Sequence, residues 1–356
     1  MTQTQDLTRS ESLKQRWDAL LEEQPRMRIR NAAQALGVSE AELLATRVGD
    51  GVTRLRPEHR AILKEVGTLG RVMALSRNAD VVHERKGEYL NGSLEQGPAG
   101  MFVGADIDLR IFWHAWATAF AVMEEGKDAP RYSLQFFAHD GSALHKIYLL
   151  PESDASAYQD LVERFRAEDQ DPVVEVRPAA PPPAERPDSE VDVAAFQAGW
   201  LGLKDTHDFF LLLRTHGVTR TQALRLAPKG HATALAPSAF RAVITAASER
   251  AMPIMVFVAN SGMVQIHTGP VQKLVDIPEW FNVTDPDFNL HVREAAIVSA
   301  WVVRKPTTDG IVTALECYDA QGTQIVQLFG ARKPGIPERE DWRALIAEVE
   351  ARTAHV

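Results

Sequence analysis

A histidine at the start of a predicted helix is the residue best placed to do chemistry in this chain. It lies in the stretch Lys204–Arg214, where Asp205 and Thr206 are both residues that favour helix N-caps. The Phe/Leu run behind them predicts a buried helix with His207 in its first turn. The positive end of a helix dipole disfavours a protonated ring, so a neutral imidazole there keeps a nitrogen lone pair for a metal ion.

The composition is that of an ordinary soluble globular protein. The chain has 356 residues, 45% of them hydrophobic and 24% charged, with a net charge of −9. The negative balance argues against nucleic acid or an anionic membrane surface as the main partner. The sequence has no leader-like N-terminus and no apolar run long enough to span a membrane, so we expect a cytoplasmic protein. Its one cysteine, Cys317, leaves no internal disulfide or multi-cysteine metal site, and its strand-like surroundings suggest a packed thiol.

Helical and strand-like patterns alternate along the chain. Residues 10–24 have helical spacing with Ser10 or Ser12 as cap, a second helix should end at Gly37, and Ser39 with Glu42 has capping-box spacing. A further helix is predicted around 155–166. Short strands are predicted within 71–76, 101–103, 109–112, 117–123 and 132–137.

A proline-rich segment divides the chain. Residues 171–190 contain six prolines among Ala, Glu and Asp, a composition that favours extended conformation over a packed core. We therefore predict an N-terminal repeat over 1–170, a linker over 171–190 and a C-terminal repeat over 191–356.

The pattern restarts after this linker. The segment 36–44 returns at 216–224, with the helix-ending glycine and the capping-box spacing both kept (217 − 37 = 180). Strand-like segments recur at shifts of 181 or 182. The fold predicted from this is α+β, an internal duplication of two similar halves, each with a large antiparallel β-sheet and flanking helices.

The duplication also isolates positions where the halves differ. In three of five such positions the C-terminal half gains positive charge or loses negative charge, which suggests one basic pocket for an anionic ligand. Solvated surface charges in a diverged repeat would give the same pattern, and both interpretations stay open at this point. The aligned pairs are His207 with Met27, Arg220 with Glu40, Lys305 with Glu124, Gln327 with Lys146, and Arg332 with Pro151.

Four motifs resemble a known family. Together with the duplication, they make the chain similar over essentially its whole length to the HemS/ChuS/PhuS family of bacterial cytoplasmic haem-handling proteins, also called hemin-degrading factors. The motifs are Val103–Phe112, Asp205–Phe210, Val302–Pro306 and Gln327–Gly335.

The resemblance implies a haem, iron protoporphyrin IX, bound in a cleft of the C-terminal half. By position, His207 matches the axial iron ligand, and Arg110 matches an arginine that reaches the opposite haem face from the N-terminal half. No catalytic residue is assigned. Arg220, Lys305 and Arg332 match residues around the propionates, Gln327 lies nearby, and Phe257 matches an aromatic of the pocket wall.

Two classes of function follow from the resemblance. As a carrier, the protein accepts haem from an inner-membrane importer and delivers it to a haem oxygenase for iron release. As an enzyme, it opens the porphyrin itself with an external electron donor, since no G-x-G-x-x-G fingerprint follows a strand here. The missing fingerprint favours the carrier. A regulatory or nucleic-acid-binding role is disfavoured by the acidic balance, and no membrane insertion is expected.

Overall fold

The chain divides into two compact units. The computed structural model describes residues 3–126, 128–181, 184–333 and 335–354. Unit 1 comprises the residues up to Arg77 together with Glu84–Ala180 and Asn260–Gln265, and unit 2 comprises Asn78–His83, Pro181–Ala259 and the residues from Ile266 onward. The described strands belong to two antiparallel sheets of nine strands each. Strands β3 (Val81–Gly87) and β12 (Met263–Gly269) have residues in both units.

Unit 1 contains five strands in the order β1-β7-β8-β9-β2 and three in the order β6-β5-β4, all antiparallel. The five are β1 Val52–Leu55, β7 Trp116–Glu124, β8 Arg131–Ala138, β9 Ala143–Leu149 and β2 Val72–Arg77, and the three are β6 Asp108–Phe112, β5 Ala99–Val103 and β4 Gly92–Ser93. The α-helices are α1 Gln3–Glu23, α2 Ile29–Leu36, α3 Glu40–Ala45, α4 His59–Glu65 and α5 Ala155–Phe165, with 3-10 turns at Val66–Leu69 and Trp113–Ala115.

Unit 2 repeats this plan. Its strands have the order β10-β16-β17-β18-β11 and β15-β14-β13. They are β10 Ala232–Leu235, β16 Ser299–Thr307, β17 Gly310–Tyr318, β18 Gln324–Gly330 and β11 Ile254–Ala259, then β15 Phe288–Val292, β14 Trp280–Thr284 and β13 Leu274–Ile277. The α-helices are α6 Val193–Leu201, α7 Asp208–His216, α8 Arg220–Arg225, α9 Ala239–Glu249 and α10 Glu340–Thr353, with 3-10 turns at Asp188–Glu190 and Glu294–Ala296.

The matching strand orders confirm the predicted α+β duplication. Val52 at the start of β1 and Ala232 at the start of β10 are 180 residues apart, and Ala143 of β9 and Gln324 of β18 are 181 apart. Gly37 ends α2 in the left-handed region, and Ser39 and Glu42 form the predicted capping box. In unit 2 only half of that box forms. Thr219 caps the helix, but the Gln222 side chain donates to Arg186 and Asp188 instead.

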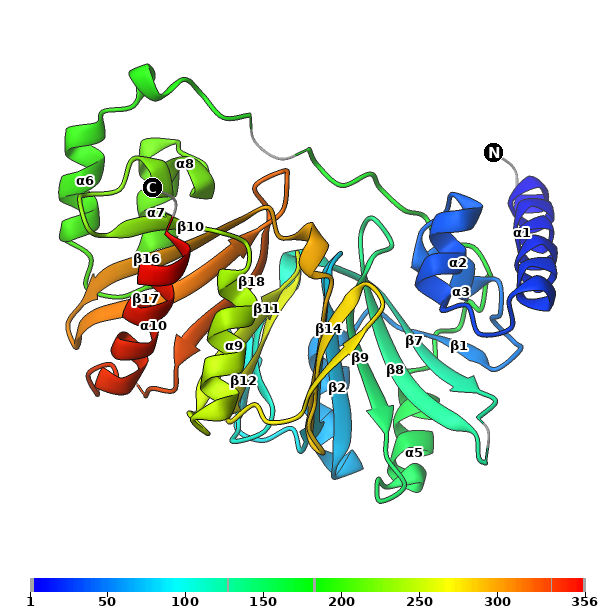
Figure 1. The fold of residues 1–356 in the computed structure, drawn as a ribbon. Helices are drawn as coiled ribbons and strands as arrows, with labels where there is room; N and C mark the ends of the chain where they lie inside the picture. The colour runs from blue at the N-terminus through cyan, green and yellow to red at the C-terminus, as the bar shows by residue number, and fades with distance from the viewer. Residues whose placement is uncertain (1–2, 127, 182–183, 334, 355–356) are drawn as a thin grey trace. The chain divides into compact units, whose positions relative to one another are not determined.

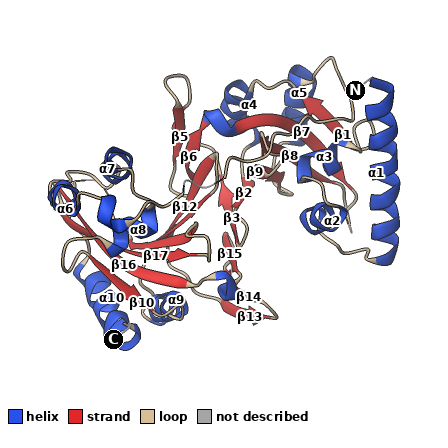
Figure 2. Cartoon of the chain, turned by 90° about the horizontal axis from the view of Figure 1, so that it is seen from above, coloured by secondary structure: helices blue, strands red, loops and turns tan. Residues whose placement is uncertain are grey.

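In unit 2 the five-stranded segment lies between two groups of helices, α9 and α10 on one face and α6, α7 and α8 on the other (Figures 1 and 2). Leu315 and Cys317 belong to the core that α9 and α10 cover, and the Cys317 thiol is buried, as predicted. Tyr318 and Val303 pack with Trp200 and Phe209 of the other group. Since side chains alternate along a strand, Glu316 faces the α6–α8 side.

The predicted cap of the first helix needs correction. Helix α1 begins near Gln3, so neither Ser10 nor Ser12 caps it, and Ser10 is a buried residue within the helix. The proline-rich segment 171–190 contains no α-helix or strand among its described residues, and its first part packs on unit 1. Val174 joins a core cluster there, and Arg54 Nη1 donates to the Val173 carbonyl over 3.0 Å. Among the described helices, none is both long and apolar enough to cross a membrane.

Two buried histidines in unit 1 make its stability depend on pH. Burial lowers the pKa of His145 to about 3 and that of His59 to about 4. His145 is held between Ser76 Oγ, at 2.9 Å from Nδ1, and Tyr89 Oη, at 2.6 Å from Nε2. In the unfolded chain these rings bind protons below about pH 6.5, whereas in the folded chain they bind protons only near pH 3–4. The free energy of unfolding therefore decreases as the pH is lowered through this window.

We therefore expect the free energy of unfolding to drop as the pH is lowered from 7 to 4.5. The shifts correspond to a loss on the order of several kcal/mol once both rings are charged in the unfolded state. Urea unfolding at a series of pH values measures this slope. His145→Gln should be less stable at pH 7 but show a flatter slope, and an unchanged slope would refute the role of His145.

Candidate functional site

His207 lies in the turn between α6 and α7. It is the N-cap residue of α7, which begins at Asp208, so the predicted position in the first helical turn is wrong by one residue. The expected N-caps Asp205 and Thr206 lie further out in the turn. The His207 side chain is 87% exposed, which leaves the ring accessible to a ligand.

Asp205 holds the His207 ring from one side. Its Oδ1 accepts the His207 backbone N–H over 2.8 Å and lies 2.5 Å from Nδ1 of the ring. The backbone hydrogen bond from His207 is the largest of the interactions that lower the pKa of Asp205. An ionised carboxylate only accepts, so Nδ1 carries a proton, and Nε2 is the ring nitrogen that a neutral imidazole would offer to a metal ion.

Asp208 fixes the rest of this turn. Its Oδ2 accepts the backbone N–H groups of Lys204 and Asp205 over 3.3 and 3.0 Å. The Thr308 N–H donates to the Lys204 carbonyl over 2.9 Å, which ties the turn to the β16–β17 hairpin.

Arg332, after β18, belongs to the same neighbourhood. Its charge contributes to the lowered pKa of Asp205. Nη2 of Arg332 lies 3.3 Å from Asp309 Oδ2 in the β16–β17 hairpin. Its Nε is buried and has no hydrogen-bond partner within the part of the chain that the structure describes. A buried donor of this kind calls for a missing acceptor.

Arg220 and Lys305 share one carboxylate, that of Glu316. Arg220, the first residue of α8, donates from Nε to Oε2 over 2.9 Å and from Nη2 to Oε1 over 2.8 Å, and Lys305 Nζ donates to Oε1 over 2.9 Å. Burial lowers the pKa of Lys305 to about 8, although Glu316 opposes the shift. The two cations lower the pKa of Glu316 despite its burial. Glu316 thus offsets one of the two positive charges of the predicted basic pocket.

Gln327 and Phe257 lie on the same face of this sheet. They are directly opposite each other on β18 and β11, and Gln327 is directly opposite Glu316 on β17. Gln327 Nε2 donates to Glu316 Oε1 over 2.9 Å. The Phe257 ring packs on Phe329 with centroids 4.9 Å apart, and both side chains are half-buried. This pair offers apolar surface beside the charged cluster.

Arg110 lies in unit 1, on β6. It forms an ion pair with Asp108, two residues earlier on the same face of the strand, and it is directly opposite the exposed Met101 of β5. Burial raises the pKa of Asp108, although Arg110 opposes the shift.

Glu316, Tyr318 and Asp205 are the residues that the sequence reasoning missed as parts of the site. Glu316 stands between the apolar Leu315 and Cys317, and the duplication aligns it with Gln135 at a shift of 181. A charged residue within a buried strand, gained in one half only, was therefore a usable signal. Asp205 was considered only as a helix cap.

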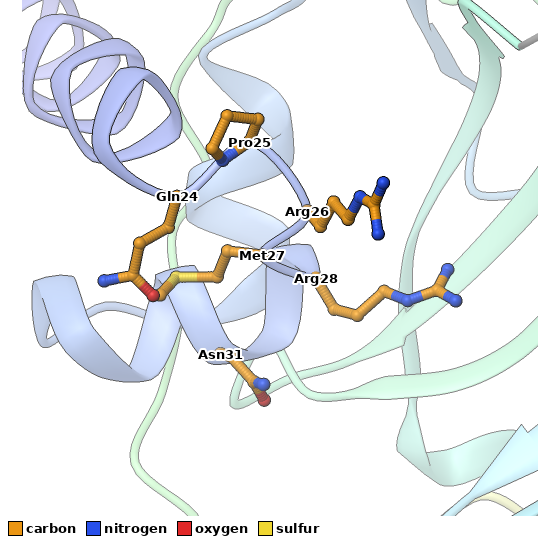
Figure 3. Close-up of a pocket in the computed structure, with 6 residues that line it drawn as sticks. All are labelled: Gln24, Pro25, Arg26, Met27, Arg28 and Asn31. Carbon is orange, nitrogen blue, oxygen red and sulfur yellow. The ribbon is translucent and has the colours of Figure 1, made fainter.

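The turn of unit 1 that aligns with the His207 turn lines a shallow depression of about 500 Å³ (Figure 3). It lies at the α1–α2 turn, and Met27 occupies the place aligned with His207. The guanidinium groups of Arg26 and Arg28 point to the same side, away from Met27. A thioether replaces the imidazole, so the residues that line this turn include no histidine. The lining residues are Gln24, Pro25, Arg26, Met27, Arg28 and Asn31.

The pairing of Asp205 with His207 leads to a prediction. Asp205→Asn should weaken binding of a metal-containing ligand at His207 by roughly 10–100-fold, because a neutral partner makes the ring a poorer donor. It should also raise the reduction potential of a bound redox metal. Asp208→Asn is the matched control, since it loosens the same turn without touching the ring and should leave the potential unchanged. Equal shifts in both variants would contradict the role of Asp205.

Comparison with known proteins gives consistent matches. The family model described as "Haemin-degrading HemS.ChuX domain" matches residues 37–165 and again 217–349. The hemin transport protein HmuS of Yersinia pestis is 39% identical over 339 residues, which are 95% of this chain and 97% of that protein.

Solved structures agree with the sequence matches. Holo-PhuS, a heme-binding protein from Pseudomonas aeruginosa, is 48% identical with a TM-score of 0.92, covering 95% of this chain and 98% of that one. The heme-degrading enzyme ChuS of Escherichia coli O157:H7 is 36% identical with a TM-score of 0.89, covering 95% and 99%. The match to the family model in both halves and the whole-length relatives lead to one conclusion. This chain belongs to the family of proteins with the haemin-degrading HemS.ChuX domain.

Proposed function

We propose that this chain binds one haem through His207 and carries it through the cytoplasm from an inner-membrane importer to a haem oxygenase, where the iron is released. The observation that carries the proposal is the His207 ring, exposed at Nε2 and held at Nδ1 by Asp205. Haem iron already has four porphyrin nitrogens and takes an axial donor from the protein, and a neutral imidazole is a common one.

The surrounding residues suit the rest of a haem. The half-buried Phe257 and Phe329 rings provide apolar surface for the macrocycle. The Nε of Arg332, which has no partner among the described residues, and the outer edge of Arg220 provide donors for carboxylates. Lys305 and Gln327 adjoin Arg220 through Glu316, so we assign all four polar residues to the propionate side of the ligand.

Haem degradation is the second candidate function. It is favoured by ChuS, which is described as an Escherichia coli heme oxygenase and is 36% identical over 95% of this chain. In that case the protein opens the porphyrin with an external electron donor. In either case haem supplies the iron chemistry, and the residues of this chain bind and orient it.

Two parallel measurements separate the candidates. The haem complex is mixed with excess apomyoglobin in a stopped-flow instrument, and in a second assay it is incubated with a reductant and catalase while bile pigments are analysed. We expect rapid transfer and little pigment. Slow transfer with stoichiometric pigment formation would overturn the carrier proposal in favour of the enzyme.

Arg110 is proposed as a further contact to the haem. Arg110→Ala should speed transfer to apomyoglobin by about 1.4- to fivefold, since a partly exposed charged contact contributes about 0.2–1 kcal/mol. The His207-ligated spectrum should be kept. Arg85→Ala is the control, because Arg85 is also an ion-paired arginine of unit 1, bound to Asp106. If Arg110→Ala abolishes pigment formation and leaves transfer unchanged, Arg110 serves degradation instead.

A further inference from the structure

The Glu316 carboxylate is the centre of a buried hydrogen-bond cluster in unit 2. The Glu316 side chain is 0% exposed. Oε1 accepts from Arg220, Lys305 and Gln327, and Oε2 accepts from Arg220, from the Tyr318 hydroxyl and, over 3.2 Å, from Gln324. Six donor bonds to two oxygens occupy the acceptor capacity of this carboxylate.

The Arg220 guanidinium binds this cluster with one edge and is partly exposed to solvent. Its Nε and Nη2 bind Glu316, and its side chain is still 29% exposed. Nη1 has no hydrogen-bond partner among the described residues. A carboxylate from outside can therefore bind at the free edge of Arg220, but it then lies close to the negative charge of Glu316.

The charges around this edge act on such a ligand together. Arg220 and Lys305 attract an incoming carboxylate, and Glu316 repels it through a buried region where electrostatic interactions are strong. Without Glu316 the cluster would carry two positive charges, and with it the cluster carries one.

We propose that Glu316 is a built-in counter-charge that weakens the hold of Arg220 and Lys305 on a ligand carboxylate, and so lets the ligand leave quickly. The inference rests on the proposed function, in which the ligand is a tetrapyrrole with two carboxylates. Faster release would explain why a carrier has a buried carboxylate next to the cations that bind its ligand.

Unit 1 shows that a neutral residue fits at this place in the fold. Gln135 aligns with Glu316 and is directly opposite Lys146, as Glu316 is directly opposite Gln327. The carboxylate of unit 1 comes from Glu40, at the helix start where unit 2 has Arg220. Glu40 binds Lys146 over 2.5 Å and also pairs with Arg77. Glu316→Gln therefore introduces the residue that the other half carries, and Glu40→Gln is a matched control.

The test is a charge series measured with haem and with haem dimethyl ester. Haem affinity should rise in the order Lys305→Met, then Lys305→Met/Glu316→Gln, then Glu316→Gln, with Glu316→Gln at least roughly tenfold tighter than wild type. Its transfer to apomyoglobin should slow by a similar factor. The ester lacks the charges, so the variants should bind it with equal affinity. Glu40→Gln, which removes the buried carboxylate that pairs with Lys146 and Arg77 in unit 1, should leave haem affinity unchanged.

Several outcomes would overturn the inference. If folded Glu316→Gln binds haem more weakly than wild type, Glu316 positions Arg220 instead of opposing the ligand. If the series keeps its order with the ester, the charges act on something other than carboxylates. Should Glu316→Gln not fold, the two Lys305→Met variants still differ only in the charge of Glu316, and equal affinities would refute the inference. If the wild-type protein binds no haem, the proposed function itself has failed. The same holds if His207→Ala binds haem with unchanged affinity.

Discussion

Replacing His207 with alanine is expected to lower haem affinity by more than roughly 100-fold and to remove the nitrogen-ligated absorption spectrum. Loss of an outer-shell partner typically costs 10–100-fold in metal affinity, so loss of the ligand itself should cost at least as much. The fold should survive, because the side chain is 87% exposed and packs into no core cluster. The residues that follow in α7 are Asp208, Phe209 and Phe210, so no second histidine in the same turn can substitute.

Two variants make this test specific. His114→Ala removes another exposed histidine, in unit 1, and should leave spectrum and affinity unchanged. His207→Gly should regain the nitrogen-ligated spectrum when free imidazole is added, because the missing donor is then supplied from solution. If His207→Ala keeps the wild-type spectrum and affinity, the iron is bound elsewhere and the proposed site is wrong.

The duplication was predictable because it depends on local chemistry that repeats. A glycine that ends a helix and a small hydroxyl residue that starts the next one recur 180 residues later, at Gly217 and Thr219, and the structure gives both the expected roles. Strand β3 was missed, since its Glu, Arg and Lys side chains obscure the apolar alternation. The strand forms because its pairing to neighbours outweighs this weak local pattern.

The start of α7 could not be predicted from the N-cap preferences of single residues. Asp205 and Thr206 are good caps by residue type, but the Asp208 side chain binds the N–H groups of Lys204 and Asp205, and the helix begins one residue after His207. The choice between neighbouring caps depends on the conformation of the whole turn, which Thr308 helps to fix. A sequence pattern contains no information on that contact.

The charges of the candidate site were predicted, but their balance was not. Comparing the halves showed the gain of Arg220 and Lys305, and both lie in one cluster. Arg220 and Glu316 are 96 residues apart, so their pairing follows only from the strand order that places β17 beneath α8. Because Arg220 is paired with Glu316, a variant of Arg220 changes the stability of the fold as well as any contact to a ligand.

Arg220→Ala is accordingly expected to lower the free energy of unfolding by about 3–5 kcal/mol, the usual cost of removing one partner of a buried ion pair. Glu316, whose side chain is 0% exposed, would keep only Lys305 as a charged partner. Arg332→Ala should cost clearly less, because Arg332 makes one 3.3 Å contact to the half-buried Asp309. Chemical unfolding of both variants measures the difference, and Arg220→Ala/Glu316→Gln should recover much of the loss.

This instability can be mistaken for a loss of ligand contact, and haem dimethyl ester separates the two causes. If Arg220 binds a propionate, Arg220→Ala should weaken haem binding but barely change ester binding, measured at a temperature where the variant remains folded. If Arg220 only supports the fold, haem and ester should lose affinity by the same factor. A variant as stable as Arg332→Ala would show that Glu316 finds other compensation, and the buried pair would then be less important than its geometry indicates. We expect the first pattern, because the free edge of Arg220 is available to a carboxylate and its other edge already holds Glu316.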